Sequence, residues 1–127
     1  MIKKRSELRE TACIILYQTD VIKNADVEEL INNNCEVKSD FVNELVYGVI
    51  THRNDLDNIA NEYMKDWDIT RIDKMGASIL RVALYELKFT DTPEIVVINE
   101  AIELAKKYSD DAVRKIINAV LDKYIKG

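Results

Sequence analysis

The chain has 127 residues, of which 47% are hydrophobic, with three glycines, one proline and a net charge of −5. This length suits one domain with a sizeable core, and the scarcity of glycine and proline favours an all-α protein. No apolar run approaches the ~18 residues of a membrane span, and there is no signal-peptide pattern. The net negative charge argues against a protein that coats nucleic acid without sequence specificity. Cys13 and Cys35 fit no metal or redox spacing, so we expect free thiols and a cytoplasmic location.

Residues 5–22 form the first predicted helix. Its expected buried stripe consists of Leu8, Ala12, Ile15, Leu16, Thr19 and Ile22. Beside this stripe, at intervals of four residues, run Arg5, Arg9, Cys13 and Tyr17, which are expected to share one flank. Two guanidinium groups and an aromatic ring on one ridge suit phosphate binding and base stacking. A solvated flank with Tyr17 half-buried fits the same pattern, and the spacing does not decide between the two interpretations.

Helix-start signals divide the middle of the chain. Asp26 followed by Glu29 predicts a short helix ending near Asn32, and Ser39 predicts the start of the next one. Gly48, inside that second helix, predicts the close approach of a neighbouring helix. The only histidine, His52, is expected at the surface or at a helix junction. Helical character resumes after about residue 54, with Tyr63 facing inward.

Residues 71–108 predict two long amphipathic helices that pack against each other, separated by a break at 90–93. Glu86 falls inside the apolar arc of the first helix, so its carboxylate must be paired or hydrogen-bonded. Arg81 falls opposite that arc, and its charge is expected to point away from the core. The expected caps are Asp68 or Thr70 for the first helix and Thr92, followed by Pro93 at the first helical position, for the second.

Ser109 is expected to cap a final helix, with Lys115 on its outward face and Tyr124 facing inward. The total is six or seven helices in a single domain spanning residues 1–127. The chain contains no Gly-rich phosphate loop, no paired Cys or His set and no nucleophile–base constellation. We therefore expect a binding or assembly protein rather than an enzyme, with no cofactor and no metal.

Several segments together resemble the NusB family of bacterial transcription antitermination factors, in the same order along nearly the whole chain. They are Leu8–Glu10 with Leu16–Tyr17, Phe41 with Leu45–Val49, Trp67 with Arg71, Ile79–Leu87, Pro93 with Ile98–Lys106, and Asn118 with Val120–Asp122. The resemblance implies an all-α fold of two small helical bundles packed across one another. It also implies binding of the boxA element of ribosomal RNA transcripts, as single-stranded RNA, together with the ribosomal protein NusE. The pair would join other Nus factors in an RNA polymerase complex that suppresses termination.

Carried over position by position, the resemblance assigns RNA contacts to eight residues. They are Lys3, Lys4, Arg5, Arg9, Tyr17, Tyr63, Arg81 and Lys115. Ser6 stands where the family usually has another arginine, and Glu7 adds a negative charge beside the basic residues. Ile14 replaces a common glutamine and Ala119 a glycine.

These departures keep other functions open. Ser6 and Glu7 motivate a protein-binding helical adaptor with little RNA binding of its own. The RNA-binding domain of an rRNA cytosine methyltransferase looks similar, but the 127 residues contain no cofactor-binding α/β region. A helix-turn-helix DNA regulator is disfavoured because no short helix pair ends in a basic recognition helix. The sequence leaves open whether the protein is a monomer or a homodimer.

Overall fold

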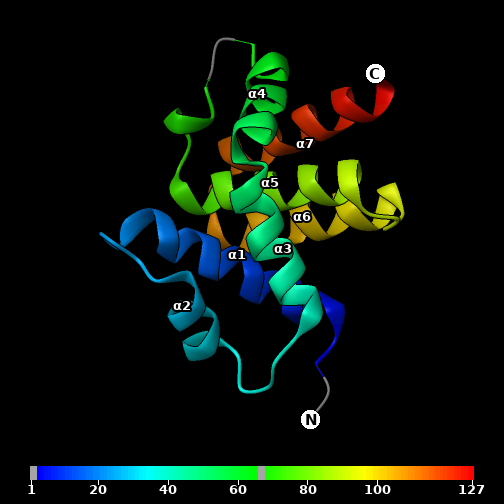
Figure 1. Ribbon diagram of the computed structural model, residues 1–127. Coiled ribbons are helices and arrows are strands. Elements are labelled where there is room, and N and C mark those ends of the chain that lie inside the picture. Colours follow the sequence, from blue (N-terminus) through cyan, green and yellow to red (C-terminus); the bar gives the residue numbers. More distant parts are fainter. Residues whose placement is uncertain (1–2, 66–67) are drawn as a thin grey trace.

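The computed structural model describes residues 3–65 and 68–127, so Trp67 lies outside the described residues. Within these ranges the chain forms only helices, and the all-α prediction is confirmed (Figure 1). They are α1 (Arg5–Val21), α2 (Val27–Asn34), α3 (Asp40–Thr51), α4 (Arg53–Tyr63), the 3-10 helix η1 (Ile69–Arg71), α5 (Lys74–Phe89), α6 (Glu94–Tyr108) and α7 (Asp111–Lys126). None of these helices has the length and apolar character needed to span a membrane.

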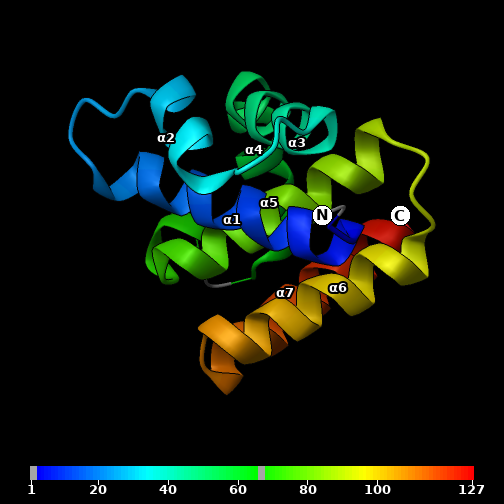
Figure 2. The same ribbon diagram turned by 90° about the horizontal axis from the view of Figure 1, so that it is seen from below.

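α1 and α5 lie between the other helices, although α4 and α7 also contact each other directly. Figure 2 shows α2, α3 and α4 on one side of this central pair and α6 and α7 on the other. α1 packs against α2, α3 and α5, while α4, α5, α6 and α7 pack against one another to form a second bundle. Because α5 contacts both groups, it joins them, as predicted for two packed helical bundles.

α5 is enclosed over most of its length. Every residue from Met75 to Glu86 is buried, including Ser78, Arg81 and Glu86. Five helices, α1, α3, α4, α6 and α7, cover it on different sides. The expectation that one face of this helix meets solvent, with Arg81 pointing away from the core, is therefore wrong. Polar groups on a helix enclosed in this way need partners inside the protein.

The first two predicted caps are confirmed. The Asp26 carboxylate accepts a hydrogen bond from the Glu29 backbone N–H at 3.2 Å. The Ser39 hydroxyl accepts one from the Val42 backbone N–H, also at 3.2 Å. Each side chain satisfies one of the N–H groups that a helix start leaves without an intrahelical partner.

The three later helix starts differ from the predictions by one residue or more. Asp68 caps η1, and Asp73 caps α5 by accepting the Gly76 N–H at 2.9 Å. α6 begins after Pro93 with no side-chain cap, and α7 is capped by Asp110 rather than Ser109. At α5 and α7 the cap is an aspartate, whose negative charge also interacts favourably with the helix N-terminus.

The close approach predicted at Gly48 is confirmed. A methyl group at this position would collide with the ring of Tyr85 on α5. The Tyr85 ring lies 5.2 Å from the ring of Phe89, and His52 stacks on Phe89 with the ring centroids 4.2 Å apart. His52 itself occupies the junction between α3 and α4, as expected. The absence of a side chain at Gly48 thus lets α3 lie against the aromatic end of α5.

Candidate functional site

The predicted ridge of Arg5, Arg9, Cys13 and Tyr17 is not one surface. A step of four residues turns about 40° around an α-helix, so three steps turn about 120°. Arg5 lies on the side of α3, with its guanidinium carbon 4.5 Å from the centre of the Phe41 ring. Arg9 and Cys13 are buried, whereas Tyr17 is 37% exposed. The prediction of a shared solvated flank is therefore wrong, because the ridge passes through the core.

The Arg9 guanidinium is enclosed between α1, α5 and α6 and is only 4% exposed. Its Nε donates to Glu86, its Nη2 donates to Glu86 Oε2 at 2.9 Å, and its Nη1 donates to Glu100 Oε1 at 2.7 Å. Burial lowers the pKa of Arg9, but the hydrogen bonds and charges of Glu86 and Glu100 outweigh it, so the pKa is raised. Glu86 has the partner that the sequence required, and that partner is an arginine assigned to RNA.

The next ridge residue, Cys13, has no exposed surface. Burial raises the pKa of its thiol well above the usual range, so the unreactive protonated form predominates. Cys35 is partly exposed, and burial raises its pKa as well. Both thiols are free, as the sequence predicted.

Arg81 is the second enclosed arginine, with 4% of its surface exposed. Its Nε donates to Asp57 Oδ1 at 2.7 Å, and its Nη1 donates to Asp20 Oδ2 at 3.2 Å. Arg53 Nη1 donates to the other oxygen of Asp20 at 2.6 Å. The resulting network joins α1, α4 and α5. Arg81 consequently holds helices together through two carboxylates.

The exposed members of the predicted set lie in separate places. Lys3, Lys4 and Arg5 are exposed together at the start of α1, whereas Lys115 lies on the outward face of α7. Tyr63, predicted to face inward, is half-buried at the end of α4 and packs edge-on against Tyr124, with ring centroids 6.4 Å apart. Three of the eight positions, Lys3, Lys4 and Arg5, are consecutive exposed cations at the start of α1, and we call them the basic patch.

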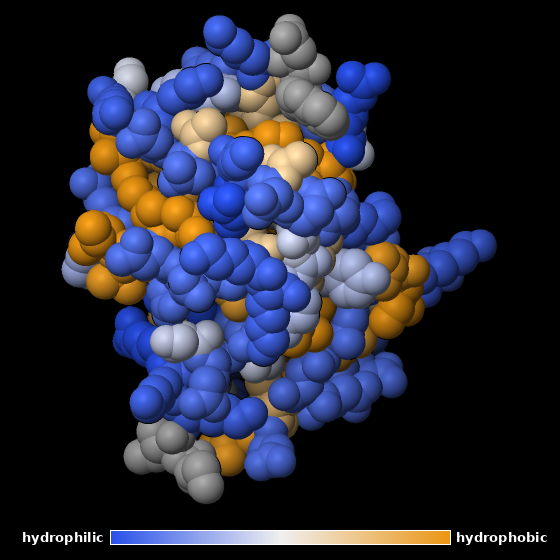
Figure 3. Space-filling model, turned by 180° about the vertical axis from the view of Figure 1, so that it is seen from behind, coloured by the Kyte–Doolittle hydropathy of each residue, from blue (hydrophilic) through white to orange (hydrophobic). Residues whose placement is uncertain are grey.

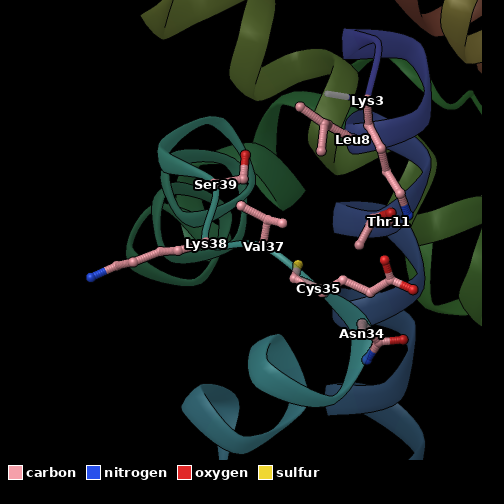
Figure 4. A pocket seen from close by; sticks show the side chains of 9 residues that line it. Lys3, Leu8, Thr11, Asn34, Cys35, Val37, Lys38 and Ser39 are labelled. Carbon is pink, nitrogen blue, oxygen red and sulfur yellow. The ribbon is translucent and has the colours of Figure 1, made fainter. Parts of the chain in front are cut away.

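A cavity of about 260 Å³ opens beside this patch, between α1 and the segment 34–39 that precedes α3. Figure 4 shows Lys3 lying along α1 toward Thr11, while Lys38 points away from the cavity. Leu8 and Val37 contribute apolar groups to the lining. Lys3 therefore borders the cavity.

Another concave surface, which the sequence does not predict, lies nearer the C-terminal end of α1. Tyr17 and Gln18 of α1, Lys74 and Met75 of α5, and Tyr108 of α6 line this groove. Tyr108 is 36% exposed. The residues come from three segments far apart in the sequence, so no local pattern identifies the groove.

Glu10 fixes the end of α6 to α1 beside this groove. Its carboxylate accepts hydrogen bonds from the Tyr108 hydroxyl and, at 2.6 Å, from Lys107 Nζ. The hydrogen bonds from Lys107 and Tyr108 lower the pKa of Glu10. Burial and the neighbouring carboxylate raise the pKa of Tyr108. The charge of Lys107 is thereby partly neutralised, and the Tyr108 ring is held at the groove.

The described part of the chain holds no cluster of three or more His, Cys, Asp or Glu side chains suited to a metal ion. Comparison with known proteins then decides the family. The NusB family model matches residues 6–126. The chain belongs to the NusB family.

Relatives named transcription antitermination protein NusB match almost the full length. The protein from Macrococcus caseolyticus is 42% identical over 126 residues, covering 97% of each chain. That of Staphylococcus aureus (strain JH9) is 40% identical over 122 residues, covering 92% of this chain and 95% of the relative. These NusB proteins and the present chain have nearly the same length.

Solved NusB structures share the fold. T. maritima NusB superimposes with a TM-score of 0.89 at 26% identity, covering 99% of this chain and 93% of that one. A crystal structure of antitermination factors NusB and NusE in complex with dsRNA gives a TM-score of 0.84 at 27% identity, covering 99% and 98%. The NusB fold therefore accommodates two enclosed arginines, Arg9 and Arg81, in this chain.

Proposed function

We propose that this chain is a transcription antitermination factor that binds boxA RNA of ribosomal RNA transcripts together with the ribosomal protein NusE, within an RNA polymerase complex with other Nus factors. The observation that carries the proposal is the match to transcription antitermination proteins NusB over 97% of the chain. A structural neighbour that contains NusB, NusE and RNA supports the same partners. Residues 1–127 would act as one RNA-binding domain without catalysis, in the cytoplasm, where bacterial transcripts are made.

Among the eight assigned residues, we propose that those with exposed side chains contact RNA directly. Lys3, Lys4 and Arg5 are exposed cations that can neutralise phosphates, and Lys115 offers a further charge on α7. Tyr17 presents part of its ring for stacking on an unpaired base, the feature that proteins recognise in single-stranded RNA. Tyr63 has a smaller accessible surface at the end of α4.

Arg9 and Arg81 take a different part in this proposal. Both guanidinium groups already donate to two carboxylates inside the protein. Direct phosphate contact would require those ion pairs to break, which leaves buried carboxylates unpaired. We infer that the two arginines position α1 and α5 and support the RNA surface without binding phosphates.

A protein-binding adaptor with little RNA affinity of its own is the second candidate. The groove that holds Arg5 and Phe41 is also lined by Asp40, Glu44 and Glu100. These carboxylates counteract the attraction of Arg5 for phosphate, and they complement a basic protein surface. In this second function the chain still binds NusE, but it contributes little to the affinity for RNA.

Equilibrium titrations distinguish the two candidates. The purified chain, alone and with NusE of the same organism, is titrated against boxA RNA and a scrambled RNA of equal length. We expect tighter binding of boxA than of the scrambled RNA, strengthened by NusE and weakened by salt. Equal affinity for both RNAs in the presence of NusE would contradict the proposal. If the chain binds NusE but leaves the RNA affinity of NusE unchanged, the adaptor function is supported instead.

A further inference from the structure

The groove between α1, the start of α5 and the end of α6 has the composition of a nucleobase site. Its two tyrosines, Tyr17 and Tyr108, come from different helices and are 37% and 36% exposed. Met75, which is 8% exposed, and Ile14 supply apolar surface between the helices. Seen from behind, hydrophobic groups gather at the edge of the molecule where α1 ends, next to groups of intermediate hydropathy (Figure 3). Aromatic and apolar groups around an open groove suit the flat face of a base.

Internal contacts hold two of the groove side chains in place before any ligand arrives. The Tyr108 hydroxyl donates to Glu10 of α1. Gln18 Oε1 accepts a hydrogen bond from Asn34 Nδ2 at 2.7 Å, which leaves the Gln18 amide nitrogen available to donate. A side chain that is already ordered loses less conformational entropy when it binds. The groove thus combines a fixed aromatic ring with a donor suited to a carbonyl group on a base edge.

The polar side chains of the groove, beside its aromatic rings, favour a nucleotide over an apolar peptide. Lys74, the first residue of α5, is exposed and lines the groove. The Asp73 carboxylate also lines the groove, where it accepts hydrogen bonds from the Gly76 N–H and the Ser109 hydroxyl, and its negative charge offsets that of Lys74. A cation next to aromatic rings matches a phosphate linked to a stacked base.

We propose that this groove binds one unpaired base of the RNA, with Tyr17 and Tyr108 as aromatic contacts and Lys74 as a contact to an adjoining phosphate. The inference rests on the proposed RNA-binding function and adds Tyr108 and Lys74 to the contact residues. It also gives a role to Tyr17 that does not depend on Arg9. The occupant is a single-stranded nucleotide within a longer RNA, since the groove offers stacking surface for a base and only one flanking cation.

The test is an abasic scan of boxA RNA with the chain–NusE complex. Each nucleotide is replaced in turn by an abasic one, and affinity is measured for the wild type and for Tyr108→Leu. We expect Tyr108→Leu to weaken binding of intact boxA about 30-fold, the middle of the range for one stacked base. At one RNA position, base removal should weaken binding to the wild type and have a clearly smaller effect on the variant, in which Tyr17 is the remaining aromatic contact.

Two control variants and one further test variant make the result specific. Tyr108→Phe keeps the ring but loses the hydrogen bond to Glu10, so it should retain the abasic penalty and lose much less affinity than Tyr108→Leu. Tyr47→Leu removes a 44% exposed tyrosine on α3, outside the groove, and should leave the RNA affinity unchanged. Lys74→Ala should make the salt dependence of binding shallower by about 0.7 in log–log slope. Thermal unfolding of each variant shows whether the fold is retained.

Two results overturn the inference in distinguishable ways. If Tyr108→Leu is folded and binds boxA with wild-type affinity and wild-type abasic penalties, the groove is not a base site, and the proposed function stands. If the wild-type complex binds boxA and scrambled RNA equally, the proposed function fails, and the groove assignment fails with it.

Discussion

Arg9 on α1 and Glu86 on α5 form a buried ion pair that joins the two helical bundles. Arg9 Nη2 donates to Glu86 Oε2 at 2.9 Å, and Glu86 has no exposed surface. Glu100 on α6 accepts from the same guanidinium at 2.7 Å. Removing one partner of such a pair leaves an uncompensated charge in the core, which costs far more than losing a surface contact.

We therefore predict that Arg9→Ala lowers the free energy of unfolding by about 3–5 kcal/mol, as measured by urea denaturation. The double variant Arg9→Met/Glu86→Leu, which replaces both charges with apolar groups of similar size, should lose much less. If Arg9→Ala lowers the free energy of unfolding by less than about 1 kcal/mol, Arg9 is not needed to compensate the buried charge of Glu86. Because Arg9→Ala is expected to be less stable, weak RNA binding by this variant would not by itself show that Arg9 contacts RNA.

The second network provides a matched pair of arginines. Arg81 is buried and contacts Asp57 and Asp20, whereas the Arg53 side chain is 45% exposed and contacts the same two aspartates. Arg81→Ala should destabilise the protein by about 3 kcal/mol or more, because it leaves partly buried carboxylates without their main partner. Arg53→Ala should cost about 0–1 kcal/mol, as is typical of exposed ion pairs. Equal losses in thermal or urea unfolding would contradict this difference.

Gly48→Ala tests the contact between α3 and α5. Alanine is the better helix former by about 1 kcal/mol, yet its methyl group would collide with the Tyr85 ring. We predict a net destabilisation of about 1–3 kcal/mol, typical of overpacked cores. In a Tyr85→Leu background the same change should be neutral or stabilising. Destabilisation of equal size in both backgrounds would rule out the collision as its cause.

The pKa of Glu10 gives a pH dependence with a definite sign. Hydrogen bonds from Lys107 and Tyr108 lower the pKa of Glu10 in the folded protein below its ordinary value of 4.5. The unfolded chain therefore binds a proton first as the pH falls, and the stabilising contribution of Glu10 is present above pH 4.5 and lost below it. Glu10→Gln should reduce the loss of stability on acidification. Identical stability–pH curves for the variant and the wild type would contradict the role of this carboxylate.

The features that the sequence predicted correctly depend on local pattern or on a strict physical requirement. Helix periodicity predicted the all-α fold, and the cost of burying a carboxylate predicted a partner for Glu86. The glycine inside α3 predicted a close neighbour, which is Tyr85. The identity of that neighbour, and the choice of Arg9 for Glu86, depend on how the helices pack, which the spacing along one helix does not specify.

The errors have the same physical origin. A helical wheel assumes one buried face, but α5 is covered by five helices. The face of α5 that carries Arg81, opposite the apolar arc, is therefore also buried. A four-residue spacing predicts a shared flank, but such a row winds around α1 and carries Arg9 into the core. The Tyr17–Tyr108 groove combines α1, α5 and α6, so only the tertiary structure brings its residues together.

The central claim is that exposed cations at the start of α1, and not the enclosed arginines, neutralise RNA phosphates. The most direct measurement is the salt dependence of boxA binding for the wild type and for Lys3→Ala/Lys4→Ala/Arg5→Ala, each in complex with NusE. We predict that the triple variant unfolds at the wild-type temperature, binds boxA more weakly and shows a log–log salt slope shallower by about two units. An unchanged slope and affinity would contradict the claim.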